Sequence, residues 1–193
     1  MRRVGLLGGT FDPPHVGHLV VAECARVLLG LEEVRLLVAG DPWMKSTVSD
    51  AEHRLELCRT AVARQPGLTV DDREVRRSGP TYTADTLREL ADTEPDTDWV
   101  FLLGADAALD LPAWEGGDEA MRLAEFVVVT RPGHPLDARA PDPVARLRRL
   151  PVPEIAISST ELRDRYRDDA PTRYLVPPDV DDLVRGLGLY GTR

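Results

Sequence analysis

Two histidines follow a pair of glycines near the start of the chain, in the run Gly8-Gly9-Thr10-Phe11-Asp12-Pro13-Pro14-His15-Val16-Gly17-His18. The apolar stretch that follows predicts that a helix begins between His15 and Gly17, which places His18 in or near its first turn. Backbone N–H groups at a helix start favour phosphate, and each imidazole can donate a hydrogen bond to a phosphate oxygen. The spacing therefore indicates phosphate chemistry, with donors placed to stabilise charge that builds on a reacting phosphorus.

The two glycines end a short apolar strand, where a backbone without side chains lets a ligand approach closely. The run has neither the Gly-Lys-Ser/Thr of a Walker loop nor the G-x-G-x-x-G of a dinucleotide site. Two alternatives stay open. His15 and His18 could bind a metal with Cys24, although the spacing from His18 to Cys24 fits one helix face poorly. They could also be two unrelated surface histidines.

A second candidate for phosphate binding lies near the other end of the chain, in Ser158-Ser159-Thr160-Glu161-Leu162-Arg163. Ser158 with Glu161 fits a capping box, which is a purely structural role. An anion site is compatible with that role, because three hydroxyl residues and the N–H groups of a helix start precede an arginine. Arg163 lies about one turn further and can bind phosphate oxygens with two N–H groups at once.

Alternating strands and helices must position these two motifs. The pattern predicts strands at 4–7, 33–38, 68–70, 73–75, 99–103, 126–130 and 154–157. It predicts helices at 17–29, from 49 or 50 to about 65, at 83–91, 115–123, 159–167 and 179–186, and a surface loop at 134–153 with a short helix near 143–150. Such alternation is typical of an α/β fold with a doubly wound parallel sheet, whose ligand lies beyond the carboxyl ends of the strands. We expect a single domain over residues 1–193, with a small helical part from about 158 to 193.

Composition excludes several other classes of protein. The chain has 193 residues, with 24 Lys and Arg against 33 Asp and Glu and a formal net charge of −9. This acidic balance argues against non-specific nucleic-acid binding. No stretch approaches the roughly 20 apolar residues of a membrane span. Cys24 and Cys58 make no disulfide framework, so we expect a cytoplasmic protein. Together with the acidic charge and the lack of a long apolar stretch, this predicts neither nucleic-acid nor membrane partners.

The run Gly9-Thr10-Phe11-Asp12-Pro13 with His15-x-x-His18 resembles the signature of the H-x-G-H nucleotidyltransferase superfamily, and Ile157 to Arg163 resembles its C-terminal motif. The resemblance implies a Rossmann-like fold and transfer of a nucleoside monophosphate from a triphosphate to a phosphorylated acceptor. It also implies that His18 stabilises the reacting phosphate. The implied ATP-binding residues are Gly8, Gly9, Thr10, Phe11, His15, His18, Ser158, Ser159, Thr160 and Arg163.

Between these motifs the chain resembles the bacterial nicotinate mononucleotide adenylyltransferases over nearly its full length. The matching segments are Asp41–Lys45, Gly79–Leu87, Leu103–Ala107, Phe126–Gly133, Arg173–Pro177 and Gly188–Tyr190. The resemblance implies transfer of AMP from ATP to nicotinate mononucleotide in NAD biosynthesis. It further implies Mg²⁺ bound through the triphosphate, with no metal held by the protein itself. Catalysis would fall to His18, His15 and Lys45, and acceptor binding to Tyr82, Thr83, Gly104, Asp106, Trp114 and Arg131.

The residue types suit these roles, although each has a simpler explanation. Lys45 could neutralise phosphates, or be an ordinary solvated lysine. Trp114 offers a flat face for a pyridine ring, or is a core residue. Tyr82 and Thr83 at a helix start suit a carboxylate on that ring. Asp106 could accept hydrogen bonds from ribose hydroxyls, or cap a helix.

Two departures from the family pattern fall on the acceptor side. The second strand ends in Val38-Ala39-Gly40 where the family usually has Val-Pro, and Glu115-Gly116-Gly117 follow Trp114. The preference for the acid or the amide mononucleotide therefore stays open. Other acceptors, including nicotinamide mononucleotide and phosphopantetheine, and a catalytically silent nucleotide-binding regulator remain alternatives. The sequence also leaves open whether the chain forms a homo-oligomer.

Overall fold

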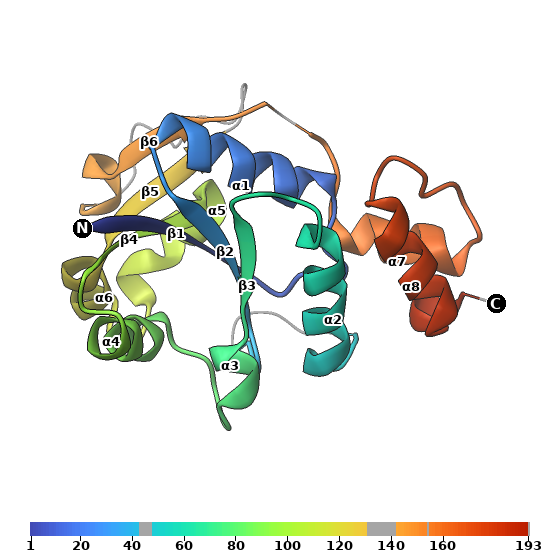
Figure 1. Ribbon diagram of the computed structural model, residues 1–193, viewed down its shortest axis with the longest axis horizontal. Helices are drawn as coiled ribbons and strands as arrows, with labels where there is room; N and C mark the ends of the chain where they lie inside the picture. Colours follow the sequence, from blue (N-terminus) through green and yellow to red (C-terminus); the bar gives the residue numbers. More distant parts are fainter. Residues whose placement is uncertain (43–47, 131–141, 154, 193) are drawn as a thin grey trace.

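The computed structural model describes residues 1–42, 48–130, 142–153 and 155–192. Six strands in this part of the chain form one parallel sheet in the order β3-β2-β1-β4-β5-β6 (Figure 1). The strands are β1 (Arg2–Gly9), β2 (Glu33–Val38), β3 (Leu68–Asp71), β4 (Thr97–Gly104), β5 (Glu125–Thr130) and β6 (Arg148–Pro151). The order runs outward from β1 in both directions, which confirms the predicted doubly wound, Rossmann-like α/β fold.

Helices cover both faces of this sheet (Figure 1). The helices α1 (Val16–Leu28) and α2 (Ala51–Val62) pack on one face, and α4 (Thr83–Thr93), α5 (Ala105–Asp110) and α6 (Gly117–Leu123) on the other. Strand β4 shows why the central strands read as continuous apolar runs. Val100 and Leu102 are buried under the first group of helices, while Phe101 and Leu103 are buried under the second.

The C-terminal helices lie beside α2 at the right of Figure 1. They are α7 (Ser159–Arg167) and α8 (Pro178–Gly186), followed by the 3-10 turn η3 (Leu189–Gly191). Leu57 and Ala61 of α2 share an apolar cluster with Leu162, Tyr166 and Val180. This packing brings the end of the chain against the helix that follows β2.

Two strand predictions are wrong. Residues 73–76 form the short helix α3 (Arg73–Arg76), because the Asp71 carboxylate accepts from the Arg73 backbone N–H at 3.1 Å and turns the chain at the sheet edge. The described residues 155–157 form no strand, and the last strand is β6, which lies in the segment predicted to be a loop with a short helix. Among residues 142–153, the described part of that segment, only the 3-10 turn η2 (Val144–Arg146) is helical. Arg148 and Arg149 are exposed on this edge strand, so the apolar signal was weak.

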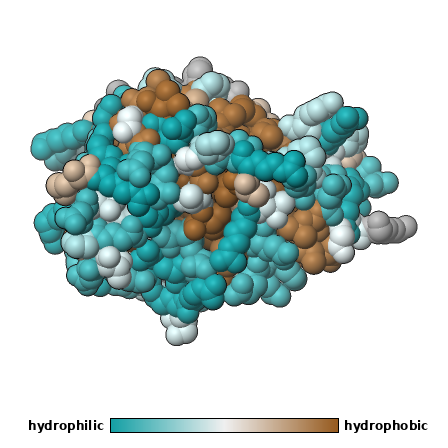
Figure 2. Space-filling view, in the orientation of Figure 1, coloured by the Kyte–Doolittle hydropathy of each residue, from teal (hydrophilic) through white to brown (hydrophobic). Residues whose placement is uncertain are grey.

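The face drawn in Figure 2 has an apolar area over α1. In Figure 2 hydrophobic side chains gather over α1, where Val27 and Leu28 are 59% and 58% exposed. No helix in the described ranges is long and apolar enough to cross a membrane. The 3-10 turn η1 (Leu111–Ala113) joins α5 to the loop that carries Trp114.

Candidate active site

A cleft of about 570 Å³ opens at the carboxyl ends of β1 and β4, where the strand order reverses. In doubly wound sheets this switch point is the usual place for a ligand. The cleft is lined by residues from both halves of the sheet. Those singled out from the sequence are Gly8, Gly9, Thr10, His18, Tyr82, Thr83, Gly104, Asp106 and Trp114.

The two histidines begin α1 as predicted. His15 is the N-cap residue, and His18 lies in the first turn. Their rings stack with centroids 3.7 Å apart, and His15 is buried behind His18, which lines the cleft. His18 Nδ1 accepts from the His15 backbone N–H at 3.2 Å. A neutral His18 with an acceptor at Nδ1 carries its proton on Nε2, so Nε2–H is its donor.

The glycines of this segment make room for aromatic rings. A Cβ on Gly9 would lie 2.9 Å from the Phe11 ring, and one on Gly8 would lie 3.2 Å from the Phe101 ring. A Cβ on Gly17 would lie 3.0 Å from Nδ1 of His15. The Phe11 ring is buried and meets the His18 ring edge-on at 4.9 Å between centroids. Phe11 therefore packs against the His18 imidazole and is not among the residues that line the cleft.

The C-terminal motif lies directly against this N-terminal segment. Ser158 is the N-cap of α7 and accepts from the Glu161 backbone N–H at 3.1 Å, which confirms the predicted cap. Ser159 Oγ donates to the Pro13 carbonyl at 2.9 Å, and Arg163 Nη1 donates to the Asp12 carbonyl at 2.8 Å. The N-terminal and C-terminal motifs, about 140 residues apart in sequence, are therefore in direct contact.

Asp12 is the centre of this contact. Its buried carboxylate accepts from the backbone N–H groups of Val48 at 2.7 Å and Ser49 at 3.3 Å, and from the Tyr190 hydroxyl at 2.8 Å. Burial raises the pKa of Tyr190, which keeps the hydroxyl a proton donor. Asp12 thus joins the N-terminal motif, the start of α2 and the C-terminal 3-10 turn.

The described residues that were predicted to bind the acceptor come from three segments of the chain. Tyr82 is the N-cap of α4 and Thr83 its first residue, so their backbone lies at a helix N-terminus. Gly104 caps α5, and Asp106 lies in the first turn of that helix. Trp114 meets the Phe101 ring edge-on at 6.2 Å between centroids, and the described residues offer its buried Nε1–H no hydrogen-bond partner.

Some predicted site residues lie elsewhere. Lys45 and Arg131 are outside the residues that the structure describes. Five of the predicted ATP-binding residues lie close to the turn that follows β1 but do not line the cleft itself: His15, Ser158, Ser159, Thr160 and Arg163. No group of three metal-ligating side chains occurs among the described residues, which include His15, His18 and Cys24.

Sequence reasoning missed two buried charged residues. Arg54 on α2 is 1% exposed, and its guanidinium donates to the carbonyls of Thr10 at 2.9 Å, Ala39 at 2.6 Å and Gly40 at 3.0 Å. Burial lowers the pKa of Arg54, although an arginine remains charged in proteins. Glu74 on α3 is 4% exposed and lines the cleft, and burial raises its pKa to about 7.

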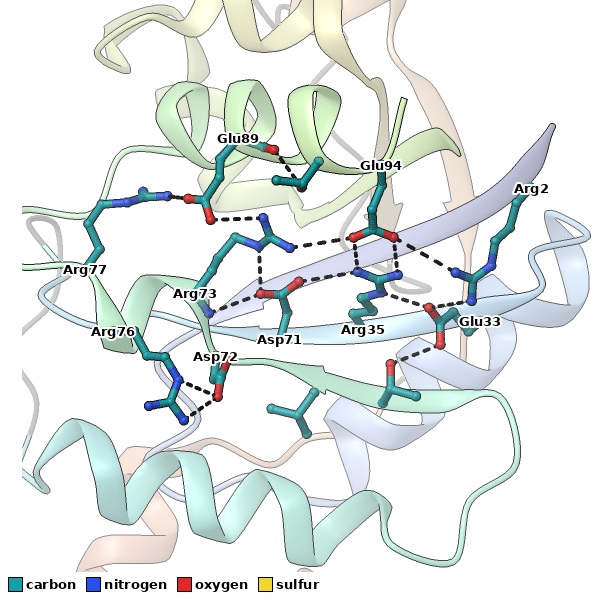
Figure 3. Close-up of a pocket in the computed structure, with 13 residues that line it drawn as sticks. Arg2, Glu33, Arg35, Asp71, Asp72, Arg73, Arg76, Arg77, Glu89 and Glu94 are labelled. Atoms are coloured by element: carbon teal, nitrogen blue, oxygen red, sulfur yellow. Dashed lines mark hydrogen bonds and ion pairs between the residues drawn. The ribbon is translucent and has the colours of Figure 1, made fainter. Parts of the chain in front are cut away.

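A larger cavity, of about 870 Å³, lies between β2, β3, α3 and α4 and contains no predicted site residue. Figure 3 shows its arginines and carboxylates pointing toward one another. Arg35 binds Glu94 at 2.7 Å and Glu33 at 2.8 Å, and these bonds raise the pKa of the guanidinium. Five arginines face five carboxylates there: Arg2, Arg35, Arg73, Arg76 and Arg77 with Glu33, Asp71, Asp72, Glu89 and Glu94. The balanced charges indicate a structural network.

A Rossmann-like sheet with Gly8 and Gly9 at the end of β1 and the His18 imidazole at its switch point is typical of a nucleotide-binding α/β protein. Residues 6–165 match the family model described as cytidylyltransferase-like. The chain is 45% identical to a protein of Clavibacter michiganensis named probable nicotinate-nucleotide adenylyltransferase, over 97% of this chain and 94% of that one. It is 44% identical to the Thermus thermophilus protein of the same name, over 97% and 99% of the two chains. The chain therefore belongs to the cytidylyltransferase-like family and, within it, to the nicotinate-nucleotide adenylyltransferases, which are nucleotidyltransferases.

A solved structure supports the fold. The Plasmodium falciparum nicotinic acid mononucleotide adenylyltransferase complexed with NaAD matches with a TM-score of 0.83, at 19% identity, over 100% of this chain and 99% of that one. At such low identity the likeness bears on the fold alone. It agrees with the single six-stranded parallel sheet seen here and confirms the fold that the resemblance implied.

Proposed function

We propose that this chain transfers the AMP group of ATP to the 5′-phosphate of nicotinate mononucleotide, releasing pyrophosphate and forming deamido-NAD. One observation carries the proposal. One cleft is lined both by Gly8, Gly9 and His18 and by Tyr82, Thr83 and Trp114. A phosphate-binding side and a surface for a ring and its carboxylate thus share one volume, as a reaction between two nucleotides requires. The names of the relatives support this choice of acceptor.

The reaction needs positioning more than acid–base chemistry. An oxygen of the acceptor phosphate forms a bond to the α-phosphorus of ATP, while the bond from that phosphorus to the pyrophosphate oxygen breaks. The nucleophile is already an anion, so no base has to remove a proton. The His18 Nε2–H donor would hydrogen-bond an α-phosphate oxygen and stabilise the charge that builds there in the transition state.

The triphosphate would lie along the junction of the two motifs. Ser159, Thr160 and the N–H groups at the start of α7 flank the glycine turn, as the contact between Ser159 and Pro13 requires. Arg163 donates to the Asp12 carbonyl and to Thr160 Oγ1, and a guanidinium has five N–H donors. We assign Lys45 the role of a cation that neutralises phosphate oxygens.

Mg²⁺ would be held by the triphosphate oxygens and by water, as is usual for this ion. When bound it would neutralise the negative charge of the leaving pyrophosphate. The donor set fits this arrangement, because Asp106 and Glu115 line the cleft as separate carboxylates, and no three ligating side chains converge within the described segments.

On the acceptor side, the backbone N–H groups at the start of α4 would bind the ring carboxylate, and Trp114 would stack on the pyridine. Asp106 at the start of α5 would accept from ribose hydroxyls, with Gly104 letting the backbone approach. We assign Arg131 to the same side.

The free Cys24 and Cys58 thiols support a reducing, cytoplasmic setting.

A pyrophosphate-release assay with ATP and a panel of acceptors tests the proposal. The panel contains nicotinate mononucleotide, nicotinamide mononucleotide, phosphopantetheine and a cytidylyl acceptor with CTP. We expect the fastest release with nicotinate mononucleotide. Faster release with phosphopantetheine would replace the proposed acceptor, and tight ATP binding without release from any pair would identify a silent regulator.

A further inference from the structure

Glu74, a buried residue of α3, is among the residues that line the cleft. Glu74 is 4% exposed, and its Oε1 accepts from the Thr86 hydroxyl at 2.7 Å. Thr86 follows Tyr82 by one helical turn, and its backbone N–H lies 3.3 Å from the Tyr82 carbonyl oxygen. The Glu74 carboxyl therefore lies beside the first turn of α4, the turn assigned above to the carboxylate of the pyridine ring.

The hydrogen bonds around Glu74 fix where its proton can sit. The Thr86 hydroxyl oxygen accepts from Arg77 Nη1 at 3.1 Å, so its own proton points to Glu74 Oε1. Oε1 is then an acceptor whether Glu74 is neutral or charged, and a proton bound to Glu74 sits on Oε2. Because burial raises the pKa of Glu74 to about 7, both charge states are populated near neutral pH.

The charged groups around Glu74 are of both signs. Arg77 and Arg73 on its own helix favour the carboxylate, and Asp71 at the end of β3 opposes it. Arg77 also pairs with Glu89 of α4, which reduces its influence. The other titratable groups that line the same cleft are His18, Tyr82, Asp106 and Glu115.

We propose that Glu74 is a specificity-determining residue, whose charge selects between the acid and amide forms of the pyridine mononucleotide. A neutral Glu74 offers an O–H donor to a ring carboxylate, as buried protonated acids do elsewhere. A charged Glu74 repels that carboxylate and instead accepts from the NH₂ of a ring amide. This inference rests on the proposed function, because it assumes that a pyridine mononucleotide occupies the cleft.

The test is the ratio of kcat/KM for nicotinate mononucleotide to that for nicotinamide mononucleotide, measured from pH 6 to pH 8.5. Taking the ratio cancels the titration of ATP, of the acceptor phosphate and of His18, which are common to both reactions. The protonated fraction of a group with a pKa of about 7 falls roughly 30-fold over this range, so we expect the wild-type ratio to fall at least about tenfold.

Two variants separate Glu74 from its surroundings. Glu74→Gln keeps an acceptor for Thr86 and cannot ionise, so its ratio should stay constant within about twofold. Asp71→Asn is the matched control, because Asp71 is a buried carboxylate on the neighbouring strand that does not line the cleft. Its ratio should still fall, because burial still raises the pKa of Glu74, but with a midpoint at lower pH, because the smaller contribution of the Asp71 charge is gone.

A wild-type ratio independent of pH would overturn the inference, and so would an equal fall in Glu74→Gln. Should Glu74→Gln not fold, calorimetry on the wild type in buffers of different ionisation enthalpy replaces it. At pH 7.5 the acid should take up more protons on binding than the amide, and equal uptake would overturn the inference. If the wild type used neither mononucleotide, the proposed function itself would fail.

Discussion

Arg54 holds together the floor of the cleft, and replacing it tests how that floor is built. Its guanidinium donates to the carbonyls of Thr10, Ala39 and Gly40, and Nε donates to the Ser49 carbonyl at 3.3 Å. Thr10 and Ala39 line the cleft. One buried cation therefore joins the turn after β1, the turn after β2 and the start of α2.

The cost of Arg54→Met follows from these bonds. A hydrogen bond to a charged group contributes about 1.5–3 kcal/mol, and bonds made by one group are not additive. Methionine keeps much of the volume but leaves the carbonyls without this donor, so we expect the free energy of unfolding to fall by about 3–5 kcal/mol. For a chain of this length, that lowers Tm by about 6–20 °C. Arg54→Lys keeps the charge but not the planar fork, and should lose about half as much.

Urea and thermal unfolding, followed by circular dichroism, measure this loss. The matched control is Arg59→Met on the same helix, where an exposed guanidinium pairs with Asp72 at 2.8 Å. An exposed pair of this kind contributes about 0–1 kcal/mol, so the control should change little. A loss below about 1 kcal/mol for Arg54→Met would refute the argument that the turns after β1 and β2 and the start of α2 depend on this cation.

Four further changes test other parts of the site. His18→Ala should lower kcat about 10²–10³-fold without changing Tm appreciably, and near-normal turnover would remove its assigned role. Trp114→Ala should raise KM for the acceptor more than KM for ATP; equal effects on both would contradict ring stacking. Tyr190→Phe removes the bond to the Asp12 carboxylate and should lower the free energy of unfolding by about 1–3 kcal/mol in urea titrations, whereas no change would show that the bond is not needed. The pKa of Glu74 is raised from 4.5 to about 7 by folding, so the folded state binds more protons and wild-type stability should decline relative to Glu74→Gln as pH rises from about 4.5 through 7; a constant difference would contradict this sign.

Features with a local signal were predictable from the sequence. Both helix starts carry their cap residues, His15 for α1 and Ser158 for α7, and the structure has them there. The central strands are buried on both faces and give continuous apolar runs. The edge strand β6 has one face exposed and begins with two arginines, so its pattern resembled a loop. The helix α5 was missed because it is short and follows directly from the strand end at Gly104.

The roles of the buried charges could not be predicted in the same way. In sequence, Arg54 and Glu74 look like ordinary solvated residues of charged segments, and only the packing of distant turns around them makes them buried. The sequence nevertheless contains one indication that Arg54 is buried. It lies four and seven residues before Cys58 and Ala61, which is the spacing of one helix face, and that face of α2 is buried. For Glu74 it contains none, since α3 is a single turn without its own apolar periodicity.

These buried charges bear on the proposed binding of a triphosphate by a chain with a net charge of −9. The Asp12 carboxylate nearest the phosphate motifs is surrounded by two N–H groups and a hydroxyl, so its charge is compensated before a ligand arrives. Arg54 places a positive charge directly under the turn that ends at Thr10. Glu74 can lose its charge by binding a proton, whereas Asp106 is proposed to accept from the ribose hydroxyls. We therefore expect hydrogen-bond donors and a buried cation, more than the net charge of the chain, to determine how the proposed phosphate end binds an anion.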